Sequence, residues 1–145
     1  MGFDDSPPTL YLLSNSGVSW LYKDFHRWPK MIEGALFFKA LYESGIPKIA
    51  IENPVMHKYA KQIIGANFTQ SIQPYQFGHP EQKRTCLWLK CLPPLKETKN
   101  VYNEMMELPD NQRQRLHYLP PSKDRALLRS KTFSGIAEAF ADQWG

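Results

Sequence analysis

The chain has 145 residues, of which 42% are hydrophobic and 13% aromatic, which is enough apolar material for a globular core and excludes a disordered chain. Lysine and arginine number 18 against 14 acidic residues, and the net charge of +4 gives only a mild bias towards anionic partners. No apolar run approaches the ~20 residues of a membrane span, and the acidic start MGFDDSPP excludes a signal peptide. We therefore expect one cytoplasmic domain over residues 1–145.

Metal-binding patterns are missing from the sequence. Cys86 and Cys91 lie in the segment TCLWLKCL without a CxxC spacing, and we expect both thiols to be reduced and partly buried. The four histidines are scattered and form no HxH or HxxxH pair, so the sequence predicts no metal site.

The N-terminal half predicts alternating strands and helices. A short strand is expected at 9–13, and the aromatic segment 18–28 cannot be assigned. Residues 29–44 predict a helix with helically spaced apolar residues. A strand at 46–53 and a helix at about 54–64 follow. Asn53 and Pro54 predict the start of that helix, because asparagine is a preferred N-cap and proline suits the first turn.

The second half predicts two extended segments, 69–77 and 84–92, joined by the turn GHPEQK and therefore antiparallel. Pro74 predicts that the first of them is an edge strand or is interrupted. Residues 92–131 read as an irregular basic insertion with two short helices, and an amphipathic helix from Phe133 to Trp144 ends the chain. This order predicts an α/β sandwich with a mixed sheet, in which the 29–44 helix connects two parallel strands by a right-handed crossover.

Glu52 draws attention because it is an acid near the end of an apolar segment expected to be a central strand. Ligands of open α/β sheets bind at the carboxyl ends of such strands, and a following helix N-terminus favours an ionised carboxylate. A solvated surface acid is the alternative that composition and spacing leave open.

Several segments, taken in order, resemble the DNA cytosine-5 methyltransferases in their short phage-type form. They are PPTLYLLSNSGVSWLY (7–22), PKIAIENP (47–54), FGHPEQKRTCLWL (77–89) and RSKTFSGIAEAFADQWG (129–145). The resemblance implies a truncated Rossmann-like methyltransferase fold with helices packed on its sheet. It also implies that Glu52 contacts a flipped-out cytosine and that Asn53 orders the site. Lys83 and Arg84 stand where the family has arginines near the active site.

The same resemblance shows what this sequence lacks. The family's nucleophilic cysteine follows a Pro-Pro pair, and Thr9 stands there. Only six residues precede Pro7, so there is no room for the glycine-rich turn that binds S-adenosylmethionine. We expect the C-terminal part of a methyltransferase-like fold, with no cofactor in this chain alone and no autonomous methylation.

A basic segment near the C-terminus predicts contacts with DNA phosphates, with a solvated basic face as the alternative. Its candidate residues are Arg113, Arg115, Lys123, Arg125 and Arg129. Aromatic residues at Trp20, Tyr22, Phe25 and Trp28 indicate either core packing or a surface for a protein partner.

Three hypotheses follow. The first is a methyltransferase-like DNA-binding protein in a bacterial cytoplasm. The second is a phage-derived interaction or inhibitor protein, of the anti-restriction kind, on a degenerate methyltransferase scaffold. The third is self-association that covers missing sheet edges.

Overall fold

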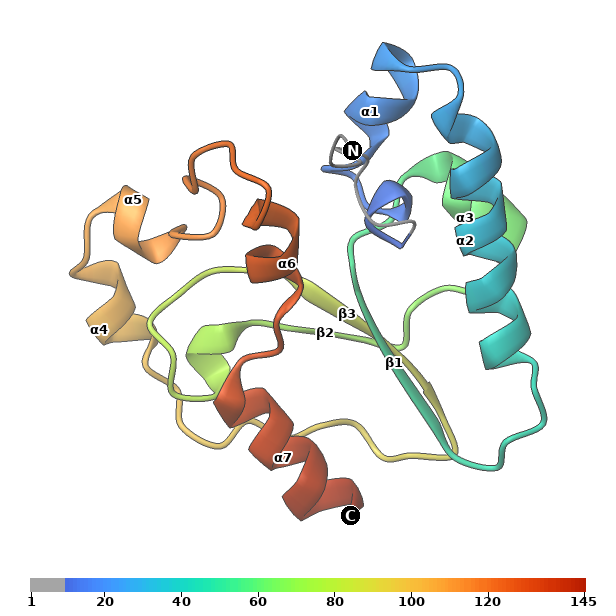
Figure 1. Ribbon diagram of the computed structural model, residues 1–145. Coiled ribbons are helices and arrows are strands. Elements are labelled where there is room, and N and C mark those ends of the chain that lie inside the picture. Colours follow the sequence, from blue (N-terminus) through green and yellow to red (C-terminus); the bar gives the residue numbers. More distant parts are fainter. Residues whose placement is uncertain (1–9) are drawn as a thin grey trace.

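A computed structural model describes residues 10–145 and shows a small sheet between two groups of helices (Figure 1). The strands are β1 (Ile49–Pro54), β2 (Gln70–Ile72) and β3 (Thr85–Lys90), in the spatial order β1–β3–β2. Both neighbours pair with β3 in antiparallel fashion. The architecture is therefore mixed α/β, built on a three-stranded antiparallel sheet.

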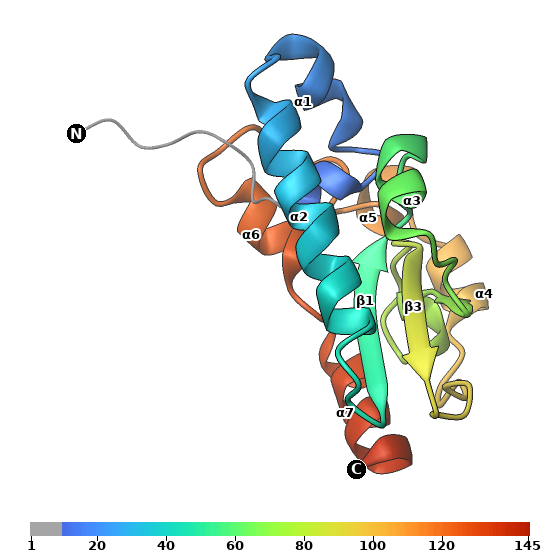
Figure 2. The same cartoon turned by 90° about the vertical axis from the view of Figure 1, so that its right-hand side faces the viewer.

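Helices lie on both faces of this sheet, as a second view shows (Figure 2). On one face are α2 (Arg27–Tyr42) and α3 (Lys58–Ile64), and on the other is α7 (Ser134–Trp144). The remaining elements are η1 (Tyr11–Leu13), α1 (Val18–Lys23), η2 (Pro74–Gln76), α4 (Tyr102–Met106), α5 (Asp110–Arg113) and α6 (Arg125–Ser130). Within residues 10–145, none of these helices has the length and apolar character needed to cross a bilayer.

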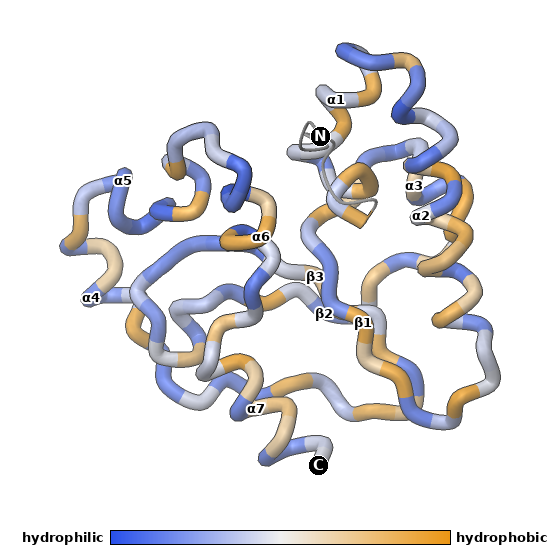
Figure 3. The backbone as a smooth tube through the Cα atoms, in the orientation of Figure 1, coloured by the Kyte–Doolittle hydropathy of each residue, from blue (hydrophilic) through white to orange (hydrophobic). Residues whose placement is uncertain are grey.

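Strand β3 is buried on both faces, and successive side chains enter different cores because strand side chains alternate. Cys86 and Trp88 belong to the cluster under α2 and α3, where the Trp88 and Phe38 rings meet edge to face. Leu87 and Leu89 belong to the cluster under α7. The hydrophobic side chains of β3 thus contribute to both cores. By contrast, the region around α5 is largely hydrophilic (Figure 3).

The predicted strand at 9–13 and its parallel crossover are wrong. Thr9 lies outside the described residues, and Tyr11–Leu13 form a turn of 3-10 helix. Ser14 stabilises this turn, because its backbone N–H and its hydroxyl both donate to the Tyr11 carbonyl, at 3.1 and 2.8 Å. The sheet formed by β1, β2 and β3 therefore contains no parallel pair, and the predicted mixed sheet is replaced by an antiparallel one.

The predicted helix start at Asn53-Pro54 is also wrong, because both residues belong to β1. The helix begins at Lys58, and His57 is its N-cap. The Ala60 N–H donates to His57 Nδ1 at 3.2 Å, while His57 Nε2 lies 2.6 Å from the Leu12 carbonyl. These two contacts require a neutral imidazole with its proton on Nε2.

Other sequence predictions are confirmed. The helix predicted at 29–44 corresponds to α2, and the antiparallel strands predicted around Pro74 correspond to β2 and β3. Pro74 ends the extended segment, since it opens η2. The basic region contains three short helices rather than two. Both cysteines are free thiols, although only Cys86 is buried.

We predict that the capping role of His57 makes stability fall as the pH is lowered. Burial lowers the pKa of His57 below its ordinary value of 6.5, although the Leu12 carbonyl opposes this shift. The unfolded chain therefore binds the proton more readily, and unfolding becomes easier as pH falls through 6.5 and then levels off below the folded pKa. Urea unfolding of His57→Asn, which retains a cap acceptor, should show a shallower pH slope than the wild type.

The matched variant His57→Ala should lose about 1 kcal/mol at pH 7.5, because it removes the cap altogether. An unchanged pH slope in His57→Asn would show that this imidazole does not couple folding to protonation.

Candidate functional site

Glu52 lies on the α7 face of the sheet. It is paired in register with Leu87, whose side chain belongs to the core under α7. The Thr132 hydroxyl, from the linker between α6 and α7, donates to Glu52 Oε2 at 3.2 Å. The carboxylate is half-buried and is held between an edge strand and this linker. The sequence predicted Glu52 on a central strand, but the central strand is β3.

Lys83 reaches the same place from the segment before β3. Its ammonium group donates to the Arg129 carbonyl in the last turn of α6. Burial lowers the pKa of Lys83, while the nearby Glu52 and Glu81 carboxylates partly oppose that shift. Glu52 therefore lies near enough to Lys83 to favour the charged form of its ammonium group.

The other two predicted catalytic residues lie on the opposite face. Asn53 is buried and paired in register with Cys86, and its amide donates to the Pro54 carbonyl at 3.3 Å. Arg84 donates to the Ser71 hydroxyl at 3.2 Å, and its guanidinium lies 5.7 Å from the Phe68 ring centroid. Alternation along β1 and β3 separates these two side chains from Glu52 and Lys83.

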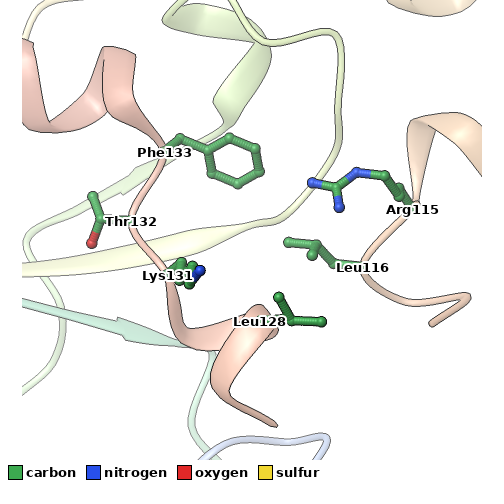
Figure 4. Close-up of a pocket in the computed structure, with 6 residues that line it drawn as sticks. All are labelled: Arg115, Leu116, Leu128, Lys131, Thr132 and Phe133. Atoms are coloured by element: carbon green, nitrogen blue, oxygen red, sulfur yellow. The ribbon is translucent and has the colours of Figure 1, made fainter. Parts of the chain in front are cut away.

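A small pocket of about 150 Å³ opens next to Thr132 (Figure 4). Its walls combine apolar side chains with two cations, from the residues Arg115, Leu116, Leu128, Lys131, Thr132 and Phe133. A cavity of about 150 Å³ has room for one six-membered ring, as a benzene-binding cavity of that size shows. The pocket is therefore suited to a flat ring that carries or adjoins negative charge.

The five predicted DNA-binding residues have different surroundings. Arg129 is used internally, because its guanidinium donates to the Leu116 and His117 carbonyls at 2.8 and 3.0 Å and to the Tyr11 hydroxyl at 3.4 Å. Arg113 is half-buried against Asp110, with N–O 3.7 Å. Arg115 pairs with Glu81 at 2.9 Å but keeps 55% of its side chain exposed. Lys123 is exposed and Arg125 half-buried.

The described residues place no thiol beside Glu52. Cys86 points to the opposite face, where burial raises the pKa of its thiol and so disfavours the nucleophilic thiolate. Cys91 is exposed beyond the end of β3. Thr9, which stands at the position of the family's cysteine, lies outside the described residues.

The part of the chain that the structure describes does not match a site for S-adenosylmethionine. Such a site needs a glycine-rich turn after a strand, and none of β1, β2 and β3 is followed by one. Among residues 10–145, no cluster of three or more histidine, cysteine or acidic side chains is arranged to hold a metal.

No site residue was predicted in the linker between α6 and α7, although the segment 129–145 carries part of the family resemblance. Thr132 and Phe133 line the pocket, and Thr132 also contacts Glu52. His79 holds the first turn of α7 beside this linker by accepting a 2.9 Å hydrogen bond from the Gly135 N–H. Glycine is required at position 135 for this close approach, because a Cβ there would lie 2.1 Å from the Phe77 carbonyl oxygen. The sequence signal was a polar SKT segment before the last helix, which by itself indicates only a helix start.

Comparison of the chain with family models, curated proteins and solved structures finds no match.

We predict that Arg129 contributes to stability rather than to ligand binding. Arg129→Ala removes three hydrogen bonds from one guanidinium and should destabilise the fold by about 2 kcal/mol, measured by urea unfolding. The matched variant Arg115→Ala removes only an exposed ion pair and should change stability by no more than about 1 kcal/mol. Equal losses in the two variants would contradict the structural role of Arg129.

Proposed function

We propose that this chain is a DNA-binding protein of the cytosine-5 methyltransferase type that recognises a base turned out of the double helix. The observation that carries the proposal is that Thr132 both contacts Glu52 and lines a pocket of one-ring size, while Lys83 contacts the adjoining end of α6. The proposal assigns base recognition to this chain and does not assign it autonomous methyl transfer.

The chemistry of the two side chains suits a cytosine edge. The carboxylate of Glu52 can accept a hydrogen bond from the cytosine amino group. The Lys83 ammonium has three donors, of which one reaches the Arg129 carbonyl, so others remain for an acceptor on the ring. Lys83 cannot form the two-pronged contact of an arginine, and the site is therefore a weaker version of the family's pattern.

The pocket supports the same proposal because its lining combines the two kinds of contact that an extruded nucleotide makes. The Phe133 ring offers a surface for base stacking, and Arg115 and Lys131 offer charge for the adjoining phosphates. Enzymes that act on bases remove them from the helical stack in this way, which costs least where the base is mismatched.

The fold is in keeping with this proposal. Helices cover both faces of the sheet, and the candidate site lies at its edge strand, as in a truncated Rossmann-like methyltransferase domain. We propose that β1, β3 and β2 correspond to one side of such a sheet.

We predict preferential binding to a duplex with one mismatched cytosine over the matched duplex, measured by fluorescence anisotropy. Glu52→Gln should keep the affinity for the matched duplex and lose this preference, because only the contact with the cytosine amino group is weakened. Binding should fall steeply with salt, and Lys131→Ala should reduce the salt slope by about 0.9 for one lost phosphate contact.

The control variant Lys61→Ala removes an exposed cation of α3, on the other side of the sheet, and should leave both slope and preference unchanged. A chain that binds neither duplex at low salt, or an undiminished preference in Glu52→Gln, would refute base recognition. Calorimetry with S-adenosylmethionine should show no heat of binding.

A protein partner is the second candidate function, and exposed aromatic side chains favour it. Phe25 is 80% exposed and Tyr22 66% exposed, whereas Trp20 and Trp28 pack partly against the core. Two large exposed rings in adjoining segments are typical of interaction surfaces. This is the phage-derived interaction or inhibitor hypothesis on a methyltransferase-like scaffold.

The two functions are separable with the same protein. If the protein surface is the functional one, the wild type should capture a restriction or other DNA-processing complex from bacterial extract. Phe25→Ser should lose this capture, and Glu52→Gln should keep it. If base recognition is the function, Glu52→Gln should lose the preference for the mismatched duplex, and Phe25→Ser should keep it.

A further inference from the structure

Among the described residues, the outer edge of β1 has no partner strand. Within residues 10–145, the only strand that pairs with Ile49–Pro54 is β3, and the bridge between Ser14 and Met56 lies beyond the C-terminal end of β1. An edge strand presents a row of backbone donors and acceptors that can pair with another strand. This edge is six residues long and contains the apolar segment Ile49, Ala50 and Ile51.

Helix α2 presents an apolar stripe beside that edge. The Trp28 ring lies 5.0 Å from the Tyr59 ring of α3, which defines the side of α2 that faces α3. Phe37 follows Trp28 by about two and a half helical turns and therefore lies on the opposite side. Phe37 is 54% exposed and Leu41, one turn later, is 40% exposed. Figure 2 shows α2 on the β1 side of the sheet, with α3 towards β3.

We propose that a second copy of this chain covers the edge, with β1 of one copy antiparallel to β1 of the other about a two-fold axis. Charge complementarity identifies the register. Centring the pair on Ala50 places Lys48 opposite Glu52 of the second copy, and does so twice, while Ile49 lies opposite Ile51. A shift of the centre to Ile51 would place Lys48 opposite Pro54 and leave Glu52 opposite Ala50.

This dimer covers both the open edge of β1 and the exposed apolar side chains of α2. A two-fold axis perpendicular to the sheet keeps α2 of both copies on the same face, so the Phe37 and Leu41 stripes meet across the axis. The two sheets become one sheet of doubled width, and each β1 loses its open edge. Lys48 precedes β1 by one residue, and in the dimer the alternation of β1 would extend to it and place it on the face of Glu52. The two Glu52 positions then lie about 14 Å apart on one face, from four residues of about 3.4 Å.

Charge reversal tests the proposal by analytical ultracentrifugation over a broad concentration series. The wild type should dimerise reversibly. Lys48→Glu should weaken the dimer about tenfold, because two cross-strand pairs change from attraction to repulsion. Glu52→Lys should do the same.

An equimolar mixture of the two charge variants should restore association. In the mixed dimer, the new glutamate of one copy faces the new lysine of the other, and the unchanged Glu52 of the first copy faces the unchanged Lys48 of the second. Both cross-strand pairs are then attractive again.

Helix variants test the second contact independently. Phe37→Lys should abolish the dimer, whereas Leu36→Lys, which changes a residue of α2 that is equally exposed at 53% but lies nearer α3, should preserve it. Circular dichroism checks that each variant is folded. A wild type that remains monomeric at the highest concentration, or a mixture of charge variants that does not associate, overturns the proposal. Glu52 is also the residue of the proposed base contact, whereas Lys48, Phe37 and Leu36 are not, and association is measured in the absence of DNA, so the Lys48→Glu and helix variants test the dimer separately from the proposed function.

Discussion

Strand β3 pairs along both of its edges and is buried on both of its faces, and the positions of the other elements depend on this. Because its side chains alternate between two cores, any residue in or next to it is committed to one face. Lys83 is committed to the α7 face and Arg84 to the α2 face. The same alternation along β1 separates Glu52 from Asn53. The pairing of β1 with β3 therefore determines which charged groups meet.

The pocket next to Glu52 is held in place by polar contacts rather than by a buried core. α6 is short and has no buried residue of its own, and Arg129 connects it to the carbonyls after α5. Thr132 then holds the linker against Glu52, and His79 holds the first turn of α7 through Gly135. These polar contacts position the pocket lining against Glu52. A residue expected to bind DNA phosphates, Arg129, instead supports the surface on which such binding would occur.

The sequence predicted those elements whose patterns are local. The stripe of α2, the antiparallel strands around Pro74 and the final helix follow from periodicity and from proline, which acts on its own backbone. The predictions at Tyr11 and Asn53 were wrong because distant contacts decided them: the Leu12 carbonyl favours His57 as the cap, and β3 extends β1 through Pro54. Glu52 and Lys83 were identified by resemblance, whereas Thr132 and Phe133 enter the site through a fold that no local pattern encodes.

The order of strands in the sheet differs from their order along the chain, and this has a consequence for synthesis. β1 and β2 are both made before β3, yet neither pairs with the other. Ile49 has no partner until Lys90 has left the ribosome, so the apolar strand segments stay open to other chains throughout that interval. A nascent polypeptide stopped before Thr85 would contain none of the three-stranded sheet, which can first form only after this middle strand has emerged from the ribosome.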